Sequence, residues 1–162
     1  ILFVLGSFML SRKFRPLILQ VSVFTVAHTI TLALATLDLV SAPSNWVEPI
    51  IALSIAIVAL ENIFFPGYRP IRLLVVFVFG LIHGLGFAGA LSAFSLDPTS
   101  LAVGLFGFNL GVEGGQLAVL LLAFGSTFWI RKERTYRKWV VIPGSLLIAV
   151  TGIYWTIERI FF

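Results

Sequence analysis

Three ionisable side chains of this chain lie deep within long apolar stretches. They are His28, His83 and Glu113. A charged side chain at the centre of a membrane helix costs about 2.5–3.5 kcal/mol on insertion scales, so each of the three needs a partner, water or a bound ion. Imidazole and carboxylate together suit divalent ions such as Ni²⁺, Co²⁺ or Zn²⁺. The three side chains therefore predict a site for a divalent metal ion.

Other polar side chains share helix faces with these three. Asn109 and Gln116 are spaced i−4 and i+3 from Glu113, which places all three on one face of a helix. Thr25 precedes His28 by one helical turn. Such amides and hydroxyls often serve only as hydrogen bonds between membrane helices. We weigh that role against a second one, in which they act as weak ligands or hold the ligands in place.

Two further carboxylates lie near the ends of one apolar stretch, Glu48 at its start and Glu61 near its finish. Either side chain can reach the membrane surface and be solvated there. The alternative is that both line the pathway of an ion. Ser54 shares a helix face with Glu61, because the two are seven residues apart, and it is a weak candidate for a nucleophile.

The composition places these side chains in a lipid bilayer. Of 162 residues, 59% are hydrophobic and 11% are charged, whereas soluble domains carry about 25% charged residues. This excludes a cytosolic enzyme and a disordered segment. The absence of cysteine excludes a disulfide-rich domain, and with Met9 as the single methionine it argues against a Cu(I) site. The chain has a net charge of +4, but its Lys and Arg residues lie between apolar runs and do not form one basic face. We therefore expect no nucleic-acid partner.

A bilayer core about 30 Å thick needs about 20 apolar residues per helix. The chain divides at its charged and Pro-rich segments into five complete spans, at 17–37, 46–65, 73–94, 101–130 and 139–158. The apolar segment Ile1–Leu10 is half that length, so we expect a first helix truncated at its N-terminus, with residues upstream of Ile1. The predicted fold is all-α, a polytopic transmembrane helix bundle with short loops, forming a single transmembrane domain over residues 1–162.

Depth along these spans places the three ionisable groups together. At 1.5 Å per residue, His28 and His83 lie about 17 Å and about 15 Å from one membrane surface, and Glu113 lies about 18 Å from the other. All three are near the midplane, and we expect them to converge on one pocket.

Two glycine patterns predict close approaches between helices. Gly80 and Gly84 flank His83, and Gly107, Gly111 and Gly115 repeat every fourth residue in the span that carries Glu113. Small residues at this spacing let two membrane helices pack closely.

The distribution of Lys and Arg predicts the orientation. Segments 11–16, 66–72 and 131–138 hold ten of the eleven cations, and segments 38–45 and 95–100 hold none. Cytoplasmic loops of membrane proteins carry the excess of Lys and Arg. We therefore expect the first three segments in the cytoplasm, and Asp38 and Glu48 on the outer side.

Four stretches of the sequence resemble the HupE/UreJ family of bacterial membrane proteins, in particular the branch with His-Gly-Leu-Gly-Phe and Asn-Leu-Gly-Val-Glu motifs. They are Phe24–Ala35, Val47–Ser54, Phe79–Ala88 and Phe108–Leu117. The resemblance implies a hydrogenase- or urease-associated accessory protein of the inner membrane that acts as a nickel or cobalt permease. The family's hallmark, a His followed by an Asp-His pair, is not in this chain and would precede Ile1. His28, His83 and Glu113 would then be part of a larger set of ligands.

The first functional hypothesis is therefore a divalent-metal permease, with nickel as the first choice, membrane lipids around it, and no enzymatic activity. A second is an intramembrane zinc hydrolase, since catalytic zinc has three protein ligands and an open position. A third is a structural subunit of a larger membrane assembly, in which the polar stripes contact other subunits.

Overall fold

The chain folds into helices throughout the part that the structure, a computed structural model, describes. The described residues are 1–10, 14–65, 67, 69–92, 98–130 and 132–162, and they contain no β-strand. The helices are α1 (Leu2–Leu10), α2 (Phe14–Thr36), α3 (Ser44–Phe64), α4 (Ile71–Ser92), α5 (Pro98–Thr127), α6 (Glu133–Tyr136), a π-helical turn (Arg137–Val141) and α7 (Ile142–Phe161). The prediction of an all-α bundle is confirmed.

Five helices are long and apolar enough to cross a membrane: α2, α3, α4, α5 and the continuous run through α6, the π-turn and α7. They correspond to the five predicted spans, with shifts of a few residues at their ends. Helices dominate because backbone N–H and C=O groups in lipid must be satisfied within the segment itself. α1 has nine residues and is too short to span.

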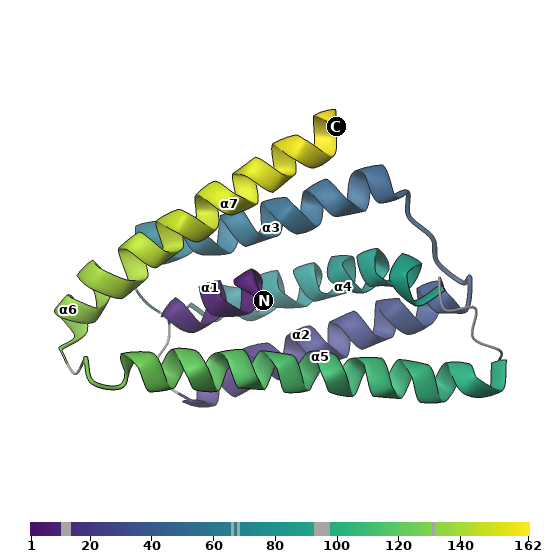
Figure 1. Ribbon diagram of the computed structural model, residues 1–162, viewed down its shortest axis with the longest axis horizontal. Helices are drawn as coiled ribbons and strands as arrows, with labels where there is room; N and C mark the ends of the chain where they lie inside the picture. The colour runs from purple at the N-terminus through teal and green to yellow at the C-terminus, as the bar shows by residue number, and fades with distance from the viewer. Residues whose placement is uncertain (11–13, 66, 68, 93–97, 131) are drawn as a thin grey trace.

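Consecutive long helices alternate in direction, but the helices that pack most extensively are not consecutive in the chain (Figure 1). α2 packs along α4, and the two run parallel. α3 packs along α7, and these two run antiparallel. α1 lies between the two pairs and touches α2, α3, α5 and α7. α5 lies at the edge of the bundle, and only 6% of its apolar membrane-spanning segment is buried inside the described protein.

Glycines bring the paired helices close together. A Cβ atom at Gly80 of α4 would lie 2.9 Å from the Phe24 carbonyl oxygen of α2, and one at Gly152 of α7 would lie 2.8 Å from the Ala56 nitrogen of α3. The packing role predicted for the α4 glycines is therefore confirmed.

The glycines of α5 do not behave as predicted. No described atom lies within 4 Å of a Cβ built at Gly107, Gly111 or Gly115. The reason is that α5 meets the bundle through its opposite face, which carries Asn109 and Gln116. The predicted close approach is therefore absent from the described part of this chain.

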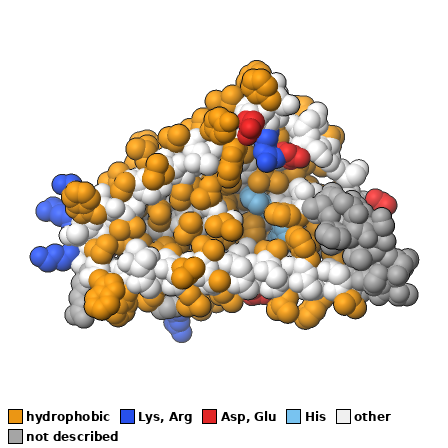
Figure 2. Space-filling view, viewed as in Figure 1, with side chains coloured by type: hydrophobic (Ala, Val, Ile, Leu, Met, Phe, Trp, Pro, Cys, Tyr) orange, Lys and Arg blue, Asp and Glu red, His pale blue; other side chains and the backbone are white. Residues whose placement is uncertain are grey.

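The two ends of the bundle differ in charge (Figure 2). We call the end that carries α6 and the starts of α2 and α4 the basic end, because Lys and Arg side chains gather there. We call the opposite end, which carries Asp38 and Glu48, the acidic end.

Candidate functional site

His28 of α2 is buried among aromatic rings from three helices, with 1% of its surface exposed. Its ring stacks between Phe24 (5.9 Å, 9° between planes) and Phe108 of α5 (6.3 Å, 20°), and the ring of Phe87 of α4 meets it edge-on at 5.5 Å. Neither Nδ1 nor Nε2 has a hydrogen-bond partner among the described residues. Buried polar atoms are normally paired, so the N–H group and the lone pair of this neutral imidazole are candidates for binding a ligand.

His83 of α4 is held in one orientation. Its Nδ1 lies 2.8 Å from the carbonyl oxygen of Phe79. A carbonyl only accepts, so Nδ1 carries the hydrogen and Nε2 carries the lone pair. Metal-binding histidines typically donate their other N–H to a carbonyl or carboxylate in this way. The hydrogen bond to Phe79 therefore leaves the lone pair of His83 Nε2 available for a hydrogen bond or a ligand.

Both histidines contact the same phenyl ring. The centroid of Phe24 lies 5.9 Å from that of His28 and 5.3 Å from that of His83, and Phe3 of α1 lies 5.3 Å from His83. We call these four residues, with Phe87 and Phe108, the histidine cluster. α2 and α4 bring the histidines together because Gly80 and Gly84 allow the two helices to touch beside His28.

Glu113 lies outside the histidine cluster. It lines an apolar pocket of about 150 Å³ between α1, α2 and α5. Val21 and Ser22 of α2 line the same pocket. Within the described ranges, no three side chains of the His, Cys, Asp and Glu types are grouped closely enough to hold a metal ion. The structure thus brings the two histidines together and leaves the glutamate one helical turn beyond Asn109, toward the basic end.

Asn109 and Thr31 form contacts between helices. The Thr29 hydroxyl of α2 donates to Asn109 Oδ1 of α5 at 2.7 Å, and Asn109 Nδ2 donates to the Leu105 carbonyl at 2.8 Å. The Thr31 hydroxyl of α2 donates to the Leu81 carbonyl of α4 at 2.7 Å. These side chains serve as interhelical hydrogen bonds, the simpler of the two roles considered for polar side chains here.

Thr25 and Ser54 differ in whether their hydroxyls find an acceptor. The Thr25 hydroxyl is buried without a partner among the described residues. The Ser54 hydroxyl donates to the Ile51 carbonyl of its own helix at 2.6 Å. Ser54, the weak candidate for a nucleophile, therefore already donates its hydroxyl hydrogen to a backbone carbonyl.

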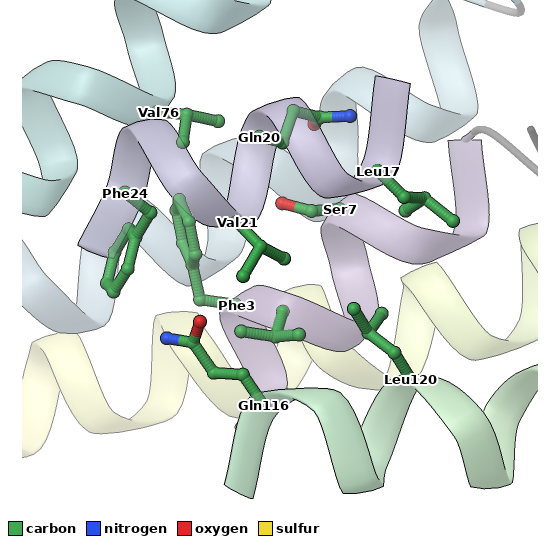
Figure 3. Close-up of a pocket in the computed structure, with 10 residues that line it drawn as sticks. Phe3, Ser7, Leu17, Gln20, Val21, Phe24, Val76, Gln116 and Leu120 are labelled. Atoms are coloured by element: carbon green, nitrogen blue, oxygen red, sulfur yellow. The ribbon is translucent and has the colours of Figure 1, made fainter. Parts of the chain in front are cut away.

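Gln116 projects toward a very small cavity between α1, α2, α4 and α5 (Figure 3). The cavity volume is about 10 Å³, roughly that of one water-sized probe. Ser7, Gln20 and Gln116 supply its polar lining, and Phe3 and Phe24 its apolar lining next to the histidines. Gln116 Oε1 and Ser7 Oγ are buried without partners within the described part of the chain.

Glu61 is part of a buried network centred on Arg72, a residue of the basic segment 66–72 that was expected to be a loop. Arg72 of α4 is fully buried. Its Nη1 lies 3.2 Å from both Glu61 Oε2 and Asn62 Oδ1 of α3, and its Nε lies 3.0 Å from Gln20 Oε1 of α2. Nη2 lies 3.4 Å from the Gly6 carbonyl of α1. One guanidinium thus joins four helices near the basic end.

A signal for this network was present in the sequence. Arg72 directly precedes the long apolar run of the third predicted span, and Glu61 and Asn62 stand at the matching end of the span before it. Opposite charges at one depth of neighbouring helices are candidates for a pair.

Glu48 stands at the acidic end, where it pairs with Arg159 of α7. It also lines a cavity of about 190 Å³ together with Asp38, Ser44, Leu85 and Gly86, among others. Gly86 follows His83 by three residues, so the cavity reaches to within one helical turn of that histidine.

Comparison with known proteins relates nearly the whole chain to one family. A family model described as "HupE / UreJ protein" matches residues 1–159. No curated protein and no solved structure gives a match.

Proposed function

Because the chain belongs to the HupE/UreJ family, we propose that it is a permease for a divalent metal ion in the bacterial inner membrane. Nickel is the first choice, and cobalt and zinc are the alternatives. The ion is the cargo of the protein. The residues proposed to bind the ion, His28 and His83 among them, lie within residues 1–159, the range that the family model matches.

The single observation that carries the proposal is the pair of buried histidines with free nitrogens. His28 has no hydrogen-bond partner among the described residues, and the bond from His83 Nδ1 to Phe79 leaves Nε2 with its lone pair. Imidazole nitrogen suits Ni²⁺, Co²⁺ and Zn²⁺. Two neutral ligands bind a divalent ion less tightly than a closed cage does, as a carrier that must release its cargo requires.

In this proposal the ion crosses from the acidic end to the basic end, which faces the cytoplasm because Lys and Arg gather there. It enters the cavity lined by Asp38 and Glu48, reaches His28 and His83, and leaves past Glu61. The Asp38 carboxylate attracts cations to this cavity before they meet the histidine cluster, whereas Glu48 is paired with Arg159.

Glu113 joins the histidines in this proposal only after α5 moves. α5 has few buried residues and touches α2 near His28 through Asn109 and Phe108, so a small shift along α2 costs few contacts. Gln116 and Thr25, whose oxygens are unpartnered among the described residues, then support the bound ion.

The test is uptake of Ni²⁺ into proteoliposomes. The double variant His28→Ala/His83→Ala should lose uptake, whereas Thr151→Val should retain it, because the Thr151 hydroxyl bonds only to Leu147 of its own helix. Wild-type rates in a correctly folded double variant would refute the histidine site.

A second candidate, a subunit of a larger membrane assembly, is favoured by one observation. The glycine face of α5 meets no described part of the chain, and such faces commonly contact another membrane helix. Copurification of stoichiometric partners without bound metal would support this candidate over the permease.

A further inference from the structure

The two sides of the histidine cluster differ in how open they are. On the acidic side lies a polar cavity of about 190 Å³, which extends to Ala35 of α2 and Gly86 of α4. Ala35 is two helical turns beyond His28, and Gly86 is one turn beyond His83. An ion coming from the acidic end therefore finds space almost to the depth of the histidines.

On the basic side the space beside the histidine cluster is narrow, and the larger pocket of about 150 Å³ near Glu113 has a mostly apolar lining between α1, α2 and α5. The cavity next to the cluster is the one of about 10 Å³ between Phe24, Gln20 and Val76. Phe24 touches both histidines, while Gln20 accepts a hydrogen bond from Arg72 and Val76 follows Arg72 by one turn of α4. Along the bundle the order is thus histidines, a space for one water molecule, and Arg72.

Arg72 blocks this side by charge as well as by size. Its guanidinium is fully buried and pairs with Glu61, whose side chain is 15% exposed. The guanidinium charge disfavours a divalent cation beside it, and the carboxylate of Glu61 offsets part of that repulsion. A buried ion pair often contributes no more to stability than apolar side chains of the same volume, so stability alone does not account for an arginine at this position.

We propose that Arg72 and Glu61 form an inner gate, and that the structure shows the protein open toward its acidic end and closed toward its basic end. The gate opens when the guanidinium leaves Glu61. The departing cargo cation then takes its place on the carboxylate, so that Glu61 keeps a positive partner throughout. This inference rests on the proposed function for the identity of the cargo, but the gate itself can be measured without any metal.

The absence of cysteine from the chain makes the measurement direct. Single cysteines are introduced as Ala35→Cys in the outer cavity and Val76→Cys beside the small one, in protein reconstituted into sealed vesicles of known orientation. A membrane-impermeant, positively charged thiosulfonate reagent is then added from one side at a time. In the otherwise wild-type protein, A35C should react from the acidic side and V76C should react from neither side.

The gate is then opened by Glu61→Gln, which removes the ion pair but keeps an acceptor for Arg72. V76C should now react from the basic side about 5- to 150-fold above the background rate seen in the wild-type protein, the range of ordinary coupling free energies. Reaction of A35C in the same background shows that the fold is intact, and Glu61→Asp provides a milder variant.

Two results would overturn the gate: V76C reacting from the basic side in the wild-type background, or V76C remaining equally slow after both Glu61 changes while A35C still reacts. Failure of the permease proposal gives a different result. Ni²⁺ uptake would then be absent, while A35C and V76C would still react as expected for the gate.

Discussion

Phe108 of α5 covers the unpartnered imidazole of His28, with ring centroids 6.3 Å apart and 20° between the ring planes. The helix that carries Glu113 is therefore also the lid over one face of the histidine. Since α5 is the least buried of the long helices, we expect access to His28 and the proposed approach of Glu113 to depend on the same movement of α5.

Loss of either histidine should weaken metal binding. His28→Ala and His83→Ala each remove an imidazole ligand. Loss of a residue that only hydrogen-bonds to a ligand lowers metal affinity roughly 10- to 100-fold, so we expect the affinity for Ni²⁺ to fall by at least that much. Calorimetric titration of purified protein in detergent measures this. Thr151→Val is the control, and an unchanged affinity in both histidine variants would count against the site.

Glu113→Gln tests whether this carboxylate is a permanent ligand of the ion or joins the histidines only when α5 moves. If it joins the histidines only when α5 moves, the variant should lower the uptake rate of Ni²⁺ more than it lowers equilibrium affinity in detergent. Parallel uptake and titration experiments give the two numbers. Equal losses in both would mean that Glu113 is a permanent ligand, and no loss in either would remove it from the pathway.

Gly80→Ala should destabilise the α2–α4 pair. The new Cβ atom would lie 2.9 Å from the Phe24 carbonyl oxygen, and overpacking of this kind costs about 1–3 kcal/mol. Gly111→Ala is the matched control, because no described atom lies within 4 Å of its Cβ position. Unfolding in mixed micelles compares them, and a clear loss for G111A instead would reveal a partner helix on α5.

The hydroxyl of Thr31 should stabilise the same helix pair modestly. Thr31→Val removes the 2.7 Å bond to Leu81 of α4, and interhelical bonds in membranes contribute about 0.6 kcal/mol on average. Thr36→Val is the control, since the Thr36 hydroxyl donates only to carbonyls of its own helix. Equal effects of the two variants on unfolding would show that the bond to α4 adds nothing.

Arg72→Ala should be among the most destabilising substitutions, because it leaves Glu61 without its partner in a largely buried position. Breaking a buried pair from one side costs about 3–5 kcal/mol. The double variant Arg72→Leu/Glu61→Leu should recover much of that loss in the free energy of unfolding. If the double variant were as unstable as the single one, the other bonds of Arg72, to Gln20 and Asn62, would carry the stabilisation.

Much of the architecture was predictable because lipid imposes simple rules. The length of apolar runs predicts the helices, since backbone polar groups in a bilayer must pair within their own segment. The Gly80 and Gly84 spacing also predicted the contact beside His83. By contrast, the α5 glycines carry the same spacing and meet nothing in the described chain, because a spacing pattern does not specify which face of a helix turns inward.

What the sequence determined by itself is the set of helices and the depth of each polar side chain, since both follow from a rise of 1.5 Å per residue along a single segment. Only the tertiary structure decided which side chains at similar depth meet. It brought His28 and His83 into contact with Phe24, placed Glu113 in another pocket, and buried Arg72, which the sequence placed in a loop. Those outcomes depend on the rotation of each helix and on the choice of its neighbour, which are decided by packing between segments far apart in the chain.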